Sequence, residues 1–141
     1  MKILVAIDGS ENSLRAAEYA AKLKESHPGN DITLFTVACY GEPMAMSESF
    51  VTYEDFTKAC LISNKAKVDR AKEIFDSKGL AVNTDVIAGD PADVILEYAN
   101  KNGFDKIIMG SRGLGSFKGM LLGSVSHKVL NLAKVPVTII K

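Results

Sequence analysis

Apolar residues gather in five short runs, and between these runs they recur every three or four positions. The runs cover residues 3–7, 32–37, 82–87, 106–109 and 137–140. Four of them are almost entirely apolar or β-branched, which is typical of strands in a parallel sheet that is covered on both faces. The run at 82–87 is more polar, and we therefore expect it nearer an edge of the sheet.

The segments between the runs predict four amphipathic helices, at residues 11–24, 56–78, 91–100 and 124–133. Ser10 is placed to cap the first helix, and Asp90 followed by Pro91 is a typical start for the third. Strands that alternate with helices predict βαβ units with right-handed crossovers. The pattern therefore favours one α/β domain over residues 1–141: a doubly wound, five-stranded parallel sheet with helices on both faces.

Composition narrows the class of protein. A chain of 141 residues can bury a core without disulfide or metal support. No apolar run approaches the ~20 residues of a membrane span, and the first run is too short for a signal peptide. Cys39 and Cys60 do not have the spacing of a metal site. We expect a cytoplasmic protein with reduced thiols that does not act at a membrane.

The charges are balanced overall but unevenly distributed. The 17 basic and 17 acidic residues give a net charge of zero, which argues against a nucleic acid as partner. Residues 1–100 carry a net charge of −6, however, and residues 101–141 carry +6. The basic end contains the segment whose residues point most clearly to a ligand.

That segment follows the fourth predicted strand and is rich in glycine. It holds five of the chain's 11 glycines: Gly110, Gly113, Gly115, Gly119 and Gly123. Glycine allows close approach of a backbone to a ligand, and its amides can form an anion nest. The segment ends at a helix start, where free N–H groups and the helix dipole favour phosphate. We therefore predict a phosphate site, the alternative being a glycine-rich loop without a ligand.

The glycine spacing also carries a family resemblance. Gly110-x-x-Gly113, nine further residues and then Gly123-Ser124 resemble the ATP-binding signature of the universal stress proteins. The resemblance covers nearly the whole chain, including ILVAIDGSENSLRAAEYA, GDPADVILEYA, KIIMGSRGLG and KVPVTIIK, and is weakest over residues 40–52. It implies a Rossmann-like fold of the adenine nucleotide alpha hydrolase-like kind, with strand order 3-2-1-4-5.

The resemblance further implies a nucleotide site across the strand ends. The triphosphate is expected on the glycines, Arg112 and Ser124, and the adenine near the ends of the first two strands. The ligand is expected to be ATP, with AMP or ADP as alternatives, and Mg²⁺ is expected on its phosphates. The expected nucleotide-binding residues are Ala6, Ile7, Asp8, Val37, Met109, Gly110, Arg112, Gly113, Gly123, Ser124, Val125 and Ser126.

Three charged or titratable residues near this site have two readings each. A carboxylate beside bare phosphates is repulsive, so we expect Asp8 on a ribose hydroxyl or on phosphate-bound Mg²⁺. The alternative for Asp8 is a turn or helix-cap residue in the sequence D-G-S. Lys118 is placed either to reach the terminal phosphate or to be a solvated surface lysine. His127 is placed either to touch a phosphate or, as we expect, to be an exposed helical residue.

The leading hypothesis is an ATP-binding universal stress protein that acts as a sensor or regulator in the stress response. A slow Mg²⁺-dependent ATPase is the enzymatic alternative, although the sequence offers no base for the attacking water and we assign no catalytic residue. The third hypothesis is a dimeric interaction module that works without a nucleotide. The resemblance implies a homodimer. The run at 137–140 gives a physical rationale for it, because a short, apolar, terminal strand can pair with its own copy.

Overall fold

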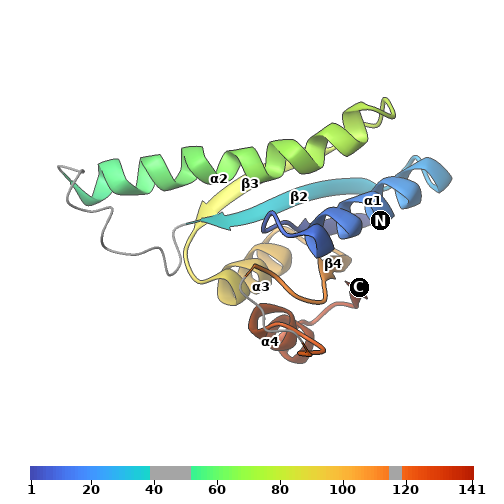
Figure 1. The fold of residues 1–141 in the computed structure, drawn as a ribbon. Coiled ribbons are helices and arrows are strands. Elements are labelled where there is room, and N and C mark those ends of the chain that lie inside the picture. Colours follow the sequence, from blue (N-terminus) through green and yellow to red (C-terminus); the bar gives the residue numbers. More distant parts are fainter. Residues whose placement is uncertain (39–51, 115–118) are drawn as a thin grey trace.

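The computed structural model describes residues 1–38, 52–114 and 119–141, and strands and helices alternate along the chain (Figure 1). The elements are β1 (Lys2–Ala6), α1 (Glu11–Ser26), β2 (Asp31–Ala38), α2 (Tyr53–Asp76), β3 (Asn83–Ala88), α3 (Pro91–Lys101), β4 (Lys106–Gly110), α4 (Ser124–Leu132) and β5 (Val137–Ile140). The strands form one parallel sheet with the order β3-β2-β1-β4-β5. The predicted strand order is therefore confirmed, and the polar strand β3 lies at an edge as expected.

Local sequence signals set the starts of the first three helices. Ser10 accepts a hydrogen bond from the Ser13 amide (3.2 Å) and caps α1, and Asp90 caps α3 through the Asp93 amide (3.1 Å). Helix α2 begins three residues before its predicted start, because Thr52 provides an N-cap through the Asp55 amide (3.1 Å). Side-chain caps of this kind satisfy N–H groups that have no partner within the helix.

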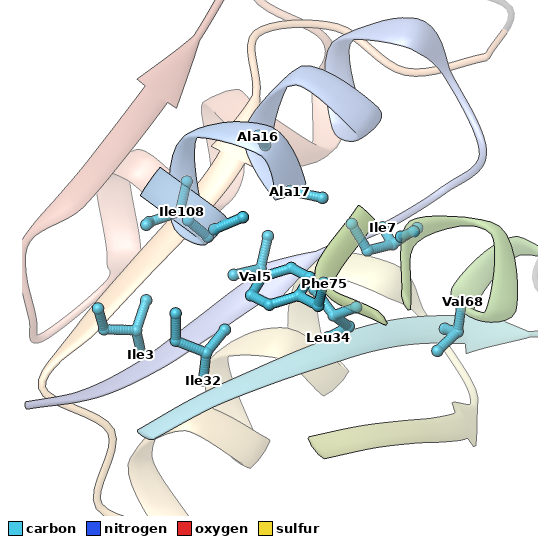
Figure 2. Packing of buried hydrophobic residues seen from close by; sticks show 13 residues of the cluster. Ile3, Val5, Ile7, Ala16, Ala17, Ile32, Leu34, Val68, Phe75 and Ile108 are labelled. Carbon is cyan, nitrogen blue, oxygen red and sulfur yellow. The ribbon is translucent and has the colours of Figure 1, made fainter. Parts of the chain in front are cut away.

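Helices α1 and α2 cover one face of the sheet, and α3 and α4 cover the other (Figure 1). Successive residues of β1 point to opposite faces, so Val5 packs under α1 and α2 while Leu4 packs toward α3. Figure 2 shows Phe75 of α2 over Val5 and Leu34. This two-sided burial explains why the strand sequences are continuously apolar.

Alanines allow α1 to approach the sheet closely. Ala16, Ala17, Ala20 and Ala21 are all completely buried, and Figure 2 shows the first two facing the strands. None of the helices in the described residues is long and apolar enough to cross a membrane. Cys60 is buried in α2, whereas Cys39 and most of the long connection at 40–52 lie outside the described residues.

The strand order changes direction at β1, and this creates the place for a ligand. The chain moves from β1 to β2 on one side and later returns to β4 on the other. The connections that leave β1 and β4 therefore diverge to opposite faces at the carboxyl ends of the strands. Open α/β sheets bind ligands in the crevice at such a point.

Candidate functional site

A cavity of about 290 Å³ lies at the carboxyl ends of β1, β2 and β4. Its volume is close to the lower end of the range of about 300–1,000 Å³ that is typical of small-molecule sites. All twelve residues predicted from the sequence line this cavity: Ala6, Ile7, Asp8, Val37, Met109, Gly110, Arg112, Gly113, Gly123, Ser124, Val125 and Ser126. The structure thus brings together residues from both ends of the sequence.

Six further residues line the cavity and were not predicted: Ser13, Phe35, Lys67, Pro91, Ile95 and Leu114. Pro91 and Ile95 lie in the first turns of α3, which starts at the same edge of the sheet, so the strand order alone could have placed them there. Lys67 lies within α2, and its sequence context carries no signal for a site.

Helix α4 begins at the cavity without a side-chain cap. Its N-cap is Gly123, whereas the starts of α1, α2 and α3 are each satisfied by a side-chain oxygen. The His127 amide donates to the Gly123 carbonyl (2.9 Å), and the amides before it have no acceptor within the helix. The positive end of the helix dipole and these amides together favour an anion in the cavity.

Two glycines allow close approaches that a side chain would prevent. A Cβ atom at Gly110 would lie 2.8 Å from Cβ of Asn12 and 2.9 Å from its carbonyl carbon, so the end of β4 packs directly on the start of α1. A Cβ atom at Gly113 would overlap Oδ2 of Asp8. Gly110 and Gly113, two of the three signature glycines, are therefore explained by the close packing around them.

Asp8 joins the two chain segments that border the cavity. Its Oδ1 accepts a hydrogen bond from the Ser10 amide (2.9 Å), and its Oδ2 accepts one from the Leu114 amide (3.3 Å). The first bond is the one expected of a turn residue, and the second fixes the carboxylate against the glycine-rich loop that follows β4. The two readings of Asp8 are thus not exclusive, because the turn residue is also a cavity residue.

The two serines of α4 differ in their surroundings. Ser124 is exposed at the first position of the helix. Ser126 is only 4% exposed and its hydroxyl donates to the Gly110 carbonyl (2.8 Å). The Ser126 hydroxyl proton therefore already fixes α4 to the end of β4 and is not available to a ligand in this arrangement.

The loop after β4 is also tied to both ends of the chain. The Ser111 amide donates to the Ile140 carbonyl (2.7 Å), and the Gly123 amide donates to the Ser111 carbonyl (2.8 Å). The Ser111 hydroxyl oxygen accepts a hydrogen bond from the side-chain amide nitrogen of buried Asn12 (3.3 Å). Arg15, one turn further along α1, donates to Asn12 Oδ1 and to the Lys141 carbonyl. These bonds hold the loop's start and end in place.

The wall that includes Phe35 is apolar and rigid. The Phe35 ring stacks on Tyr98 of α3, with ring centroids 4.3 Å apart. The Tyr98 hydroxyl donates to Asp85 Oδ2 (2.8 Å). Burial, this hydrogen bond and the nearby negative charge raise the pKa of Tyr98 to about 12. The phenol therefore stays neutral at ordinary pH and supports the cavity wall.

The charged groups around the cavity favour an anion. Arg112 and Lys67 are cationic, and Asp8 is the one acidic residue among the described lining residues. His127 is exposed on α4 and does not line the cavity, as predicted. Lys118 lies outside the described residues. In the parts of the chain that the structure describes, no three histidines, cysteines or carboxylates are grouped as a metal site.

Comparison with known proteins gives a family for the chain. A family model described as "Usp: Universal stress protein family" matches residues 1–141. Universal stress protein YxiE of Bacillus subtilis is 34% identical over 148 residues, which cover 99% of this chain and 98% of the relative.

Solved structures share the fold over their whole length. The structure of hypothetical protein MJ0577, from Methanocaldococcus jannaschii, has a TM-score of 0.84 and 28% identity, and the match covers 99% of this chain and 94% of that one. The universal stress protein from Archaeoglobus fulgidus in complex with dAMP has a TM-score of 0.69 and 23% identity, with coverage of 100% and 98%.

Proposed function

The chain belongs to the universal stress protein family, and on this premise we propose that it binds an adenine nucleotide, ATP in the first instance, in the cavity at the strand ends. The observation that carries the proposal is the uncapped start of α4, which opens into a cavity bordered by Gly110, Gly113 and Arg112. Phosphate is the common biological ligand for free amides at a helix N-terminus.

The phosphates are assigned to the loop between β4 and α4. The Ser124 and Val125 amides, the exposed Ser124 hydroxyl and the Arg112 guanidinium supply donors and positive charge there. Ser126 contributes its backbone amide and holds the helix start in position through Gly110. Donors fixed in this way lose little conformational freedom when the ligand binds.

The adenine is assigned to the apolar part of the cavity. Ala6, Ile7 and Val37 border it from the sheet, and the buried Phe35 ring lies in the same wall. A purine gains from burial against apolar and aromatic surfaces of this kind. The Archaeoglobus fulgidus relative holds dAMP, and its fold matches this chain over its whole length, which supports an adenine nucleotide as the class of ligand.

We propose that Asp8 meets a ribose hydroxyl or a phosphate-bound cation. Mg²⁺ is usually held by one or two carboxylates together with phosphate oxygens, and Asp8 provides one carboxylate at the cavity. We therefore assign Mg²⁺ to the nucleotide, with Asp8 as its protein partner. The ion would neutralise part of the phosphate charge.

The geometry favours binding over hydrolysis. Both carboxylate oxygens of Asp8 already accept backbone hydrogen bonds, and no histidine is among the described residues that line the cavity. A base for an attacking water is therefore not evident. We propose that the protein is a cytoplasmic sensor or regulator for which the bound nucleotide is the signal, and that hydrolysis of the nucleotide is not its main role.

A homodimer through β5 is part of the proposal. β5 is an edge strand of four partly buried residues, Val137–Ile140. The Pro136 and Ile140 carbonyls point toward β4, because they accept hydrogen bonds from the Ile107 and Ser111 amides respectively. The direction of the backbone groups alternates along a strand, so those of Thr138 also point toward β4. By alternation, the backbone groups of Val137 and Ile139 point to the open edge, where a second copy can pair with them.

Isothermal titration with ATP tests the binding proposal. Wild-type protein freed of nucleotide should bind ATP, and a variant carrying Gly113→Val and Gly123→Val should lose binding because side chains enter the phosphate loop. Equal binding by both proteins, or no binding by the wild type, would contradict the proposal. Thermal unfolding of the variant shows whether the loss of binding is separate from a loss of fold.

A further inference from the structure

We propose that Lys67 of α2 is a specificity-determining residue of this site, and that it makes the site favour nucleotides with more phosphates, ATP over ADP over AMP. The inference rests on the proposed nucleotide-binding function and deepens it. Its basis is the position of Lys67 on the cavity, in a helix that contributes no other lining residue among those the structure describes.

The aliphatic stem of Lys67 packs on the turn that follows β1. Gly9 of this turn has a φ of 86°, and a Cβ atom there would lie 3.2 Å from Cγ of Lys67. The lysine stem thus lies directly against the backbone next to Asp8. This contact brings a cation from α2 to the turn that also carries the carboxylate of the site.

The ammonium group of Lys67 is held by a neutral partner. Its Nζ donates to Asn64 Oδ1 (2.6 Å), and Asn64 is only 2% exposed, with its Nδ2 donating to the Cys60 carbonyl (2.9 Å). An asparagine inside a helix is unfavourable for the helix itself, yet here its side chain is buried and fixed. The anchor restrains the lysine side chain without neutralising its charge.

Other lysines of α2 have a different kind of partner. Lys58, Lys65 and Lys72 each form an ion pair with a carboxylate one turn away, Glu54, Asp69 and Asp76 respectively. No such pair is present for Lys67 in the described part of the chain. Its charge is therefore available to a ligand, whereas the charges of the other three are balanced by their own helix.

The charge of the cavity then depends on Lys67. With Arg112 and Lys67 against Asp8, the ionised lining side chains carry one net positive charge, and without Lys67 they carry none. Attraction between opposite charges grows with the charge of the ligand, and each added phosphate group increases that charge. Loss of Lys67 should therefore weaken ATP most, ADP less and AMP least.

Calorimetric titration of ATP, ADP, AMP and adenosine, in buffer without Mg²⁺, against four proteins tests this. The proteins are the wild type, Lys67→Gln, Lys67→Arg and the matched control Lys65→Gln on the exposed side of the same helix. We expect Lys67→Gln to weaken ATP about tenfold and AMP about twofold, and to leave adenosine unchanged. Lys65→Gln should keep the wild-type order and affinities, and Lys67→Arg, which retains the positive charge, should keep the order. Lys67→Gln should reduce the salt dependence of ATP binding.

Two results would overturn the inference. One is wild-type ATP affinity in Lys67→Gln, and the other is an equal loss for ATP and adenosine, which is the sign of a structural effect. Both leave the proposed function intact, since the wild type still binds nucleotide. A wild type that binds none of the four ligands would instead remove the proposed function, and this inference with it.

Discussion

A Cβ atom at Gly113 would overlap Oδ2 of Asp8, so any side chain at position 113 would have to displace the Asp8 carboxylate. The loop after β4 and the carboxylate after β1 are therefore complementary surfaces: one lacks a side chain where the other projects one. The Leu114 amide donates to the same oxygen (3.3 Å), so the contact is a hydrogen bond as well as a close approach. The two residues together define the side of the cavity assigned to the phosphates.

Gly113→Ala should therefore impair binding more than folding. The added methyl group meets the end of a side chain, which can rotate away, so we expect the free energy of unfolding to fall by less than about 1 kcal/mol. Displacement of the carboxylate should weaken ATP binding about tenfold. Calorimetry and denaturant unfolding measure the two effects separately.

A double-mutant cycle with Asp8→Ala identifies the cause. Because the clash requires the Asp8 carboxylate, Gly113→Ala should cost much less additional affinity in the Asp8→Ala background than in the wild type. Additive losses would show that the glycine acts through some other contact.

Gly110→Ala should affect folding instead. A Cβ atom there meets the Cβ and carbonyl carbon of Asn12 and, at 3.0 Å, the Ser13 amide nitrogen, so the backbone of α1 must move. Overpacking of this kind costs about 1–3 kcal/mol of unfolding free energy. Gly29→Ala is the matched control, because nothing lies within 4 Å of its Cβ position. Equal stability of the two variants in urea would be inconsistent with the close packing of β4 on α1.

Tyr98 should make the fold sensitive to alkali. Its pKa is raised from 10.0 in the unfolded chain to about 12 in the folded one, so the folded state retains a proton that the unfolded state loses. Its contribution to stability is complete below pH 10 and is lost as the pH rises from 10 to 12. Ultraviolet titration should show a phenolate step near pH 12.

Tyr98→Phe provides the control for that titration. The variant lacks the ionising hydroxyl, so the phenolate step near pH 12 should disappear and the decrease in stability between pH 10 and 12 should become smaller. The Phe35 stack does not need the hydroxyl and should persist. An unchanged step in the variant would assign it to another tyrosine.

Val137→Pro tests the proposed dimer. Proline lacks an N–H group, and the alternation along β5 directs the Val137 N–H to the open edge, away from β4. We expect light scattering to give the mass of a dimer for the wild type and of a monomer for the variant, with the far-ultraviolet circular dichroism retained. Thr138→Pro, which removes a bond to β4, should instead lower the thermal stability. A dimer mass for Val137→Pro would place the interface elsewhere.

The sequence predicts most of this fold because its local and long-range signals agree. A strand that is buried on both faces requires a continuous apolar run. β1 is an example, because Leu4 and Val5 are buried on opposite faces of the sheet. The caps Ser10 and Asp90 are set by neighbouring residues and can be recognised in isolation. The apolar pattern predicts the start of α2 three residues too late, because the first turn after Thr52 carries the acidic residues Glu54 and Asp55 in place of apolar ones.

The part of the candidate site that is formed by one sequence segment can be predicted from the spacing of its glycines. The part that is formed by packing between distant segments cannot be predicted in this way. Gly110, Gly113 and Gly123 belong to one segment, so their spacing is visible. The Ser126 hydroxyl donates to the Gly110 carbonyl, a contact that only the folded chain shows. Lys67 reaches the cavity because α2 crosses the β1–α1 turn, and helical periodicity does not encode that crossing.

Binding of an adenine nucleotide at the start of α4 should change the environment of the backbone amides there, which is measured by amide chemical shifts during an ATP titration of nitrogen-15-labelled protein. We expect the largest shifts at the amides of Gly113, Gly123, Ser124 and Val125, and we expect these shifts to saturate with added ATP. Absence of saturable shifts, or shifts concentrated at the separate cavity lined by Leu96 and Leu132, would contradict binding at the start of α4.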